Sequence, residues 1–454
     1  MKTFLGGVHP PEAKEATADL AIVSVPAPAV VAVPLAQSLG KPAAPVVEKG
    51  APVKVGSLIG RAAGFVSAAV HSPVSGRVKA VEKRTDFLGR WVEHVVLEND
   101  GKDEWAPGTN DPAGRAPSDP AALRARVLEA GIVGMGGATF PSHVKLSPPQ
   151  GKPIDTVVLN GAECEPYLTC DYRLMMEETE AVLEGLEFVR AMTLAARSIV
   201  AIEANKPEAI RRFSALAAGK PNLSVETMEA KYPQGGERQL ISALLGRTVP
   251  AGGLPLEVGV VVHNVGTAFA IREAVCRNKP LVERVLTVSG DAIERPGNFR
   301  VRVGTPIRIL FERCGLKPFA RRLILGGPMM GLSQRSLELP VTKGTSGVLA
   351  LKGDDPAAWG DCVRCGRCVR ACPQRINPSM LSIAAECRRE DLFAGMEYLE
   401  CVECGACAYV CPARRPIVQF VKYAKEALRL QKANAPKPAP APAAAPAGAG
   451  ERKP

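Results

Sequence analysis

The chain has 454 residues, of which 46% are hydrophobic and 5% aromatic, a composition typical of a water-soluble globular protein with more than one domain. The formal net charge of +11 favours acidic partners, but no basic stripe with interleaved aromatic residues and no nucleic-acid module accompanies it, which argues against nucleic-acid binding. Three prolines interrupt the longest apolar stretch, residues 20–36, and the N-terminus lacks the apolar core of a signal peptide, so we expect no membrane-spanning helix and no secretion.

We expect residues 1–105 to form a β-rich domain, because short Val, Ile and Leu runs alternate there with Pro and Gly at the spacing of turns. The segments VEKGAPVKVGSLIG and HSPVSGRVKAV resemble the half-motifs of a biotinyl/lipoyl-type barrel-sandwich hybrid. Neither segment carries a lysine in the hairpin position that such carriers modify. A structural version of that fold is therefore predicted.

A linker rich in Pro, Gly and Asp follows at residues 102–120, and a helix is predicted directly after it, with Ser118 or Asp119 as its N-cap. Gly131 is the expected end of that helix. Strand-like and helix-like segments then alternate, which is typical of βαβ units. We therefore predict a Rossmann-like parallel α/β domain over residues 118–280.

The last part of the chain predicts three further units. Short strands over residues 281–335 indicate a β-grasp domain, and the cysteine-rich residues 355–432 indicate a helical domain built around metal. Residues 417–431 have an amphipathic basic pattern, which predicts a helix packed on that domain or, alternatively, docked on a partner or membrane surface. The Pro/Ala-rich residues 433–454 are expected to be disordered.

Eight of the 13 cysteines form two matching groups, each with the spacing C-x2-C-x2-C-x3-C-P. This spacing is that of bacterial two-cluster ferredoxins, in which the fourth cysteine of each group binds the other group's cluster. Structural zinc is the alternative, but zinc sites use four ligands, most often as two CxxC pairs. We therefore predict two 4Fe-4S clusters, one bound by Cys362, Cys365, Cys368 and Cys411 and the other by Cys401, Cys404, Cys407 and Cys372.

Two glycines within these groups, Gly366 and Gly405, let the backbone wrap the sulphurs without a Cβ clash. Cysteines clustered for metal rather than for a disulfide framework indicate a reducing compartment. The remaining five cysteines are scattered and are expected to be buried, inert thiols: Cys164, Cys170, Cys276, Cys314 and Cys387.

A glycine-rich segment, GIVGMGGATFPSHVK, follows the first predicted helix of the α/β domain. Bare backbone at Gly134, Gly136 and Gly137 can approach a phosphate or a flavin ring, and Lys145 can neutralise a phosphate. A glycine turn without a ligand is the alternative.

Polar clusters also follow three predicted strands, at the strand ends where open α/β sheets bind ligands. The first cluster contains Asn160, Glu163, Glu165 and Asp171. The alternative interpretation of this cluster is a solvated acidic loop.

The segments GMGGATFPSHVK, NGAECEP, YPQGGER and HNVGT resemble, in the same order, motifs of the FMN- and NADH-binding subunit of respiratory complex I. From FLGGVHPP near the N-terminus to the double cysteine motif, residues 3–430 resemble the RnfC family of peripheral subunits of the Rnf electron-transport complex. The resemblance implies that Phe140, Glu163 and Glu165 line the nicotinamide side of the site. It implies FMN bound by Gly134, Gly136, Gly137, Lys145, Asn160, Glu237, Asn264 and Thr267.

Three positions depart from the complex I pattern, and they bear on the NAD(H) contacts more than on the FMN contacts. Met135 replaces a loop arginine, Arg238 replaces a second glutamate, and His263 replaces an asparagine. No catalytic acid, base or nucleophile is expected, Cys164 included, because the cofactors carry the chemistry and the protein positions them.

The resemblance implies a subunit of a complex that transfers electrons between NAD(H) and ferredoxin through FMN and two 4Fe-4S clusters and couples this transfer to ion translocation. The expected partners are the other Rnf subunits, including the ferredoxin-like RnfB, together with ferredoxin and NAD(H). The expected location is peripheral, on the cytoplasmic face of the bacterial inner membrane, where the chain does not itself move ions. Two alternatives remain: an RnfC-like flavin and iron–sulphur cobalamin reductase, and a non-catalytic cluster relay with a vestigial flavin pocket.

Overall fold

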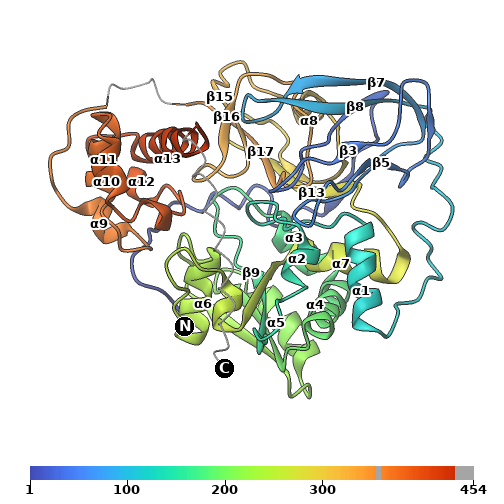
Figure 1. Ribbon diagram of the computed structural model, residues 1–454, viewed down its shortest axis with the longest axis horizontal. Helices are drawn as coiled ribbons and strands as arrows, with labels where there is room; N and C mark the ends of the chain where they lie inside the picture. The colour runs from blue at the N-terminus through green and yellow to red at the C-terminus, as the bar shows by residue number, and fades with distance from the viewer. Residues whose placement is uncertain (354–358, 435–454) are drawn as a thin grey trace, which may run out of the picture.

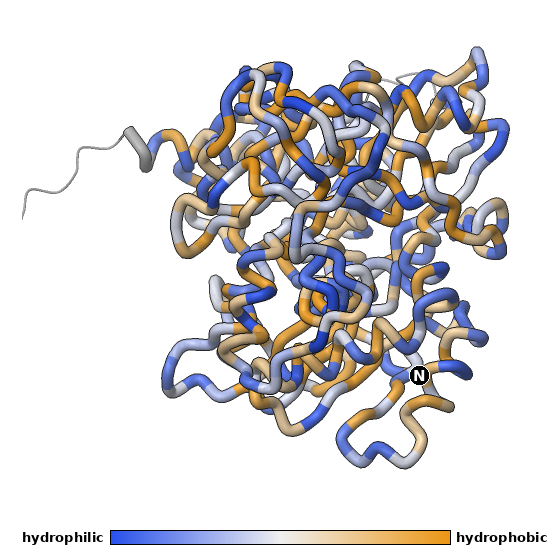
Figure 2. Tube along the Cα trace, turned by 90° about the vertical axis from the view of Figure 1, so that its right-hand side faces the viewer, coloured by the Kyte–Doolittle hydropathy of each residue, from blue (hydrophilic) through white to orange (hydrophobic). Residues whose placement is uncertain are grey.

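The computed structural model describes residues 1–353 and 359–434 and divides them among an N-terminal β sandwich, an α/β domain, a mixed-sheet domain and a helical cysteine-rich domain (Figure 1). Most of the tail predicted to be disordered lies outside the described residues. Hydrophobic and hydrophilic residues alternate over short distances along the trace (Figure 2), and within the described ranges no helix is long and apolar enough to cross a membrane.

The N-terminal sandwich consists of two small sheets, as its sequence predicts. One sheet has the order β2-β8-β7-β4 and the other the order β3-β5-β6. Val31 and Val33 of β2 pair with Leu97 and Val95 of β8, and all four side chains lie in one apolar core. The strands are β2 (Val30–Pro34), β3 (Ala44–Pro45), β4 (Pro52–Val53), β5 (Leu58–Arg61), β6 (Val70–His71), β7 (Gly76–Thr85) and β8 (Trp91–Asn99).

The α/β domain begins with α1 (Pro120–Glu129), whose predicted cap is confirmed because the Asp119 carboxylate accepts from Ala122 N at 2.8 Å. Its four strands are all parallel, in the order β11-β10-β9-β12. Helices α1, α4, α5 and α7 cover one face of this sheet and α6 covers the other. The strands are β9 (Thr156–Gly161), β10 (Arg197–Glu203), β11 (Leu223–Met228) and β12 (Val260–Asn264).

One helix predicted in this domain, over residues 175–192, is in fact two helices. The break falls at Glu178, which leaves the helical conformation at φ −129°, and the Thr179 hydroxyl donates to Met175 O at 2.6 Å across it. The helices of the domain are α2 (Ser142–Lys145), α3 (Cys170–Glu177), α4 (Thr179–Thr193), α5 (Pro207–Ala217), α6 (Glu237–Leu245) and α7 (Val265–Arg277), with the 3-10 helix η1 (Pro255–Val258).

The mixed-sheet domain contains the predicted β-grasp strands and two additions. Its sheet has the order β1-β14-β13-β17-β15-β16, so the N-terminal strand β1 (Ile22–Ser24) joins it in parallel and β17 (Gly347–Leu351) completes its centre. Phe311 of α8 is part of its core. The other elements are β13 (Glu283–Ser289), β14 (Gly297–Arg302), α8 (Ile307–Cys314), β15 (Arg322–Leu325) and β16 (Leu332–Gln334).

The cysteine-rich domain is helical, and its last helix, α13 (Ile417–Asn434), is the predicted amphipathic helix. Ile417, Val421, Ala424 and Leu428 are buried along one face of it, and three of them share a core with α10 and α11. The packed alternative is therefore the one that the structure supports. The remaining elements are α9 (Arg367–Ala371), α10 (Pro378–Glu386), α11 (Glu390–Ala394), η2 (Tyr398–Glu400) and α12 (Ala406–Tyr409).

Candidate functional site

The glycine-rich loop between α1 and α2 lies against the N-terminus of α7. Gly134 N donates to Phe140 O at 2.8 Å, and Met135 N donates to the buried Thr267 hydroxyl oxygen at 2.9 Å. A Cβ at Gly136 would lie 3.0 Å from the Asn264 amide nitrogen, whereas a Cβ at Gly137 would meet nothing within 4 Å. The loop is thus hydrogen-bonded to α7 through Met135, while the space beside the Gly137 backbone is open.

Two predicted FMN residues lie at the carboxyl ends of neighbouring strands, where the sheet order changes direction. Asn264 caps α7 by accepting from Gly266 N at 2.8 Å, and its amide nitrogen donates to Asp171 Oδ2 at 2.6 Å. Asn160 Nδ2 donates to Gly235 O at 2.8 Å, which fastens the YPQGGER segment to β9. Ligands of open α/β sheets bind in the crevice at such a switch point.

Lys145 and Glu237 meet at this edge. Lys145 Nζ donates to Glu237 Oε1 at 2.5 Å and to Val262 O at 3.2 Å. Burial and the nearby Lys145 ammonium lower the pKa of His263 to about 3, so its ring is neutral. The buried Nε2 of His263 and both amide atoms of the buried Gln234 lack hydrogen-bond partners within the described part of the chain.

These features fit a polar ligand with an anionic end. The open backbone at Gly137 can accept a flat ring close to the chain, and Lys145 supplies a cation for a phosphate. The unpartnered atoms of Gln234 and His263 are donors and acceptors of the kind that ribityl hydroxyls and ring carbonyls require. FMN therefore fits the residues present.

The two predicted nicotinamide-side glutamates point to different places. The Glu163 carboxylate accepts from the backbone N–H groups of Asp171 and Tyr172 at 2.7 and 3.1 Å, at the start of α3. The Glu165 carboxylate accepts from Met329 N and Met330 N at 3.0 and 2.8 Å, in the mixed-sheet domain. The structure therefore keeps Glu163 and Asp171 together beside the carboxyl ends of β9 and β12 but turns the Glu165 carboxylate away from them.

A lysine and an arginine from distant parts of the sequence support this edge. Lys14 Nζ donates to the carbonyls of Glu163, Glu165 and Leu168 at 2.8, 2.9 and 2.5 Å. Arg284 of β13 is 4% exposed, and its Nη1 lies 2.6 Å from the Met135 sulphur. The loop that lacks an arginine at position 135 thus has a guanidinium beside it, contributed by another domain.

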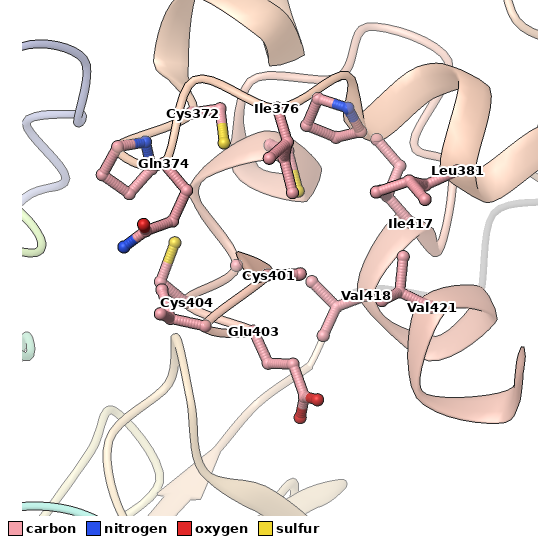
Figure 3. Close-up of a pocket in the computed structure, with 15 residues that line it drawn as sticks. Cys372, Gln374, Ile376, Leu381, Cys401, Glu403, Cys404, Ile417, Val418 and Val421 are labelled. Atoms are coloured by element: carbon pink, nitrogen blue, oxygen red, sulfur yellow. The ribbon is translucent and has the colours of Figure 1, made fainter. Parts of the chain in front are cut away.

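Three cysteines of the second group and one of the first line a single cavity. Cys372, Cys401, Cys404 and Cys407 all line it, which is the set predicted for one cluster by the crossover rule. Figure 3 shows the Cys372 and Cys404 side chains turned toward one another across this space. Burial, with Cys372 and Cys401 nearby, raises the pKa of the Cys404 thiol to about 11. The rest of the lining includes an apolar wall of Ile376, Leu381, Ile417, Val418 and Val421.

Four thiols around a largely apolar space fit a 4Fe-4S cube, whose irons each take one thiolate. The first cysteine group has the same backbone design: Gly366 and Gly405 cap α9 and α12 at φ +71° and +82°, and Arg364 and Glu403 share a positive φ as well. Burial raises the pKa of the Cys368 thiol, and the nearby Cys362 raises it further. The place of Cys411 beside that group stays a prediction.

The expected burial of the scattered cysteines is confirmed for two of the five. Cys170 and Cys314 are buried, while Cys164 and Cys276 are half-buried, and burial raises the pKa of all four thiols. The prediction of burial is wrong for Cys387, which is exposed just after α10 ends.

Four family models match the chain in order and confirm the predicted fold class. They are the RnfC barrel sandwich hybrid domain over residues 2–102, the Nuo51 FMN-binding domain over residues 127–273, the SLBB domain over residues 285–333 and the 4Fe-4S dicluster domain over residues 358–412.

Relatives match the chain along most of its length. The chain is 46% identical over 436 residues to a subunit of the proton-translocating ferredoxin:NAD(+) oxidoreductase complex of Clostridium ljungdahlii, covering 94% of each chain. It is 42% identical to the corresponding subunit of the Na(+)-translocating complex of Acetobacterium woodii, covering 95% of this chain and 98% of that one. It is 41% identical to that of the ion-translocating oxidoreductase complex of Rhodobacter capsulatus, covering 93% of this chain and 82% of that one.

Proposed function

The chain belongs to the RnfC family of subunits of ion-translocating ferredoxin:NAD(+) oxidoreductase complexes, and from this premise we propose how its residues hold the cofactors of that reaction. It is an oxidoreductase subunit that works with FMN, two 4Fe-4S clusters and NAD(H), within a complex that couples electron transfer between NAD(H) and ferredoxin to ion translocation. When bound, FMN exchanges a hydride with NAD(H) and single electrons with the clusters.

The flavin site is proposed at the carboxyl edge of β9 and β12. Gly136 and Gly137 leave room for the flavin over the loop. Lys145, which pairs with Glu237 in this structure, neutralises the flavin phosphate instead when FMN is bound. The side chains of Asn160, Asn264 and Thr267 hold the walls of the site in place, because they hydrogen-bond to the segments that enclose it. Gln234 and His263 join the proposed site, since their buried polar atoms need partners there.

NAD(H) is proposed to approach from the side of Phe140 and Glu163. The Glu163 carboxylate accepts hydrogen bonds from the N-terminus of α3, so its proposed role is to hold that helix end and the neighbouring Asp171 in place. Glu165 ties the acidic segment to the mixed-sheet domain and bears on NAD(H) only through that tie.

The clusters are proposed to bind the cysteines in the crossed pattern. The observation that carries this proposal is the cavity shared by Cys372 with Cys401, Cys404 and Cys407, because Cys372 belongs to the first group in sequence and to the second in space. By the same rule Cys411 completes the set of Cys362, Cys365 and Cys368.

The partners are proposed to be the other subunits of the complex, a ferredoxin-like subunit and ferredoxin among them, on the cytoplasmic face of the bacterial inner membrane. The net charge of +11 supports an acidic redox partner. The buried apolar face of α13 is covered by its own domain, so docking through that face is not proposed. The names of the relatives specify protons in one species and Na+ in another, so we assign no coupling ion.

Anaerobic reconstitution tests the proposal. The purified chain is loaded with iron, sulphide and FMN, and NADH is then added while flavin absorbance and EPR signals are recorded. We expect flavin bleaching and two interacting signals of reduced 4Fe-4S clusters. Clusters that dithionite reduces, without bound flavin or a response to NADH, would identify a relay instead. Reduction of added cob(II)alamin in preference to ferredoxin would favour the cobalamin reductase alternative.

A further inference from the structure

Residues 4–9, here called the N-terminal strap, run between the cysteine-rich domain and the α/β domain (Figure 1). Gly7 N donates to Ala371 O at 2.9 Å. Val8 N donates to Tyr232 O at 2.8 Å, and Tyr232 N donates back to Val8 O at 2.9 Å. The strap therefore binds the residue before Cys372 on one side and the start of the YPQGGER segment on the other.

The strap fits these neighbours only because two of its residues are glycines. Gly6 has φ +81°, and a Cβ there would lie 2.7 Å from Cys372 O. Gly7 has φ +82°, and a Cβ there would lie 2.7 Å from Tyr232 O. Both the backbone conformation and the space exclude a side chain. The two glycines of the FLGGVHPP motif therefore let the strap pack directly against the backbone at Cys372 and at Tyr232.

Tyr232 makes the second connection. Its side chain is 1% exposed, and its hydroxyl donates to the carbonyl oxygen of Cys404 at 2.6 Å. Val8, Tyr232 and Cys404 share one buried cluster with Ala371 and Ala406. Only Pro233 separates Tyr232 from Gln234, which belongs to the proposed flavin site. Tyr232 therefore links the YPQGGER segment to the backbone of Cys404, one of the four cysteines that line the cavity.

Other contacts between the α/β domain and the cysteine-rich domain reach the same loop. Arg238 of α6 pairs with Glu400, the residue before Cys401. Gly252 N donates to the other carboxylate oxygen of Glu400 at 2.8 Å. Together with Tyr232, these contacts fix the loop of Cys401 and Cys404 against the proposed flavin site.

We propose that Tyr232, held by the N-terminal strap, is a positioning residue that fixes the four-cysteine site of Cys372, Cys401, Cys404 and Cys407 against the flavin-binding edge. This inference rests on the proposed function for the identity of the two cofactors. The strap acts on Cys372 and the Tyr232 hydroxyl acts on Cys404, so the two contacts hold opposite sides of one site. Their shared effect is to set the distance and the local field between that site and the flavin edge.

The test compares Tyr232→Phe with Tyr423→Phe, which removes the hydroxyl of a half-exposed tyrosine on α13. Each full-length variant is reconstituted with iron, sulphide and FMN, and the cluster midpoint potentials are measured by EPR-monitored dithionite titration. We expect Tyr232→Phe to shift one of the two potentials and to slow cluster reduction by NADH about tenfold, because small misplacements of reacting groups are costly. Tyr423→Phe should match the wild type. A Cys365→Ala background, which removes the first cluster, should retain the shifted potential.

A second variant acts from the strap. Gly6→Ala should alter the same potential, whereas Gly50→Ala, at a glycine with a similar positive φ (+88°) in open space, should not. Loss of the iron of one cluster alone in Tyr232→Phe or Gly6→Ala would also support the proposal. Unchanged potentials and rates in both variants, or equal effects on both clusters, would overturn it. If the wild-type chain binds no FMN, the proposed function fails, while the dithionite titration still decides the role of Tyr232.

Discussion

Asn160 and Asn264 are register partners at the carboxyl ends of the parallel strands β9 and β12. The sheet order changes direction between these strands, so their ends are not covered by a crossover connection. Each side chain fastens one wall of the site: Asn160 holds the segment at Gly235, and Asn264 lies under Gly136. The glycine loop and the YPQGGER segment therefore meet above one polar edge of the sheet.

Gly136→Ala and Gly137→Ala should separate the effects of fold and ligand at this edge. An added Cβ at Gly136 would approach the Asn264 side chain to 3.0 Å, so the apo protein should lose about 1 kcal/mol of unfolding free energy. An added Cβ at Gly137 meets no protein atom within 4 Å. Gly137→Ala should therefore leave apo stability unchanged and weaken FMN binding at least about tenfold. Urea unfolding and quenching of FMN fluorescence measure the two effects; unchanged FMN affinity in Gly137→Ala would place the flavin elsewhere.

Lys145→Met should weaken FMN binding by roughly ten- to a hundredfold, because a charge-assisted hydrogen bond contributes about 1.5–3 kcal/mol. Lys145 is half-buried beside Glu237 and His263, whose neutral ring does not replace the lost charge. Lys152→Met, at a more exposed lysine of the same domain, is the control and should bind FMN like the wild type. Riboflavin lacks the phosphate, so its affinity should not change in Lys145→Met; an equal loss for both flavins would contradict a phosphate contact.

The sequence predicts those parts of this site whose signals are local. Asp119 caps its helix, strands and helices alternate, and the cysteine spacing identifies the clusters, because each pattern lies within a short segment. The contacts that join domains have no local signal. Arg284 reaches Met135 across 149 residues, and Tyr232 reaches Cys404 across 172. The strand β1 joins β14 in the same way, through a pairing that short-range patterns cannot indicate.

The departures from the complex I pattern show the same difference. Read alone, Met135 is a lost arginine and Arg238 a lost glutamate. In the structure, Arg284 places a guanidinium beside Met135, and Arg238 pairs with Glu400 next to a cluster cysteine. Both substitutions therefore have partners in other domains, which only the tertiary arrangement shows.

A double-mutant cycle on Arg238 and Glu400 should measure how firmly the two domains are joined. Both side chains are largely buried, at 23% and 16% exposure. We expect Arg238→Met and Glu400→Gln to show a coupling free energy of about 1–2 kcal/mol in urea unfolding. The same cycle on the exposed pair Arg308 and Glu312 should give less than about 0.5 kcal/mol. Equal coupling in the two cycles would mean that the Arg238 pair does not fix the domains.

Stability should fall as pH rises through the range set by Glu165. Burial raises the pKa of its carboxyl from 4.5 to about 7, although the N–H groups of Met329 and Met330 act in the opposite direction. Between these values the folded chain keeps a proton that the unfolded chain releases, so the free energy of unfolding decreases by on the order of 3 kcal/mol with rising pH and then levels off. Glu165→Gln should remove this part of the pH dependence. Urea unfolding near pH 5 and pH 8 measures it, and parallel curves for both proteins would refute the assignment.

The crossed ligation of the clusters makes a prediction about pairs of cysteine variants. If Cys372 and Cys407 bind the same cube, Cys372→Ala combined with Cys407→Ala should remove no more iron than Cys407→Ala alone. Combining Cys372→Ala with Cys365→Ala should instead remove the iron of both cubes, because each variant then disables a different one. Iron content after anaerobic reconstitution distinguishes the two pairs, with Cys387→Ala, at an exposed cysteine outside both groups, as the control. If the two double variants lose iron in the opposite order, each group binds its own cube, and the shared cavity has another cause.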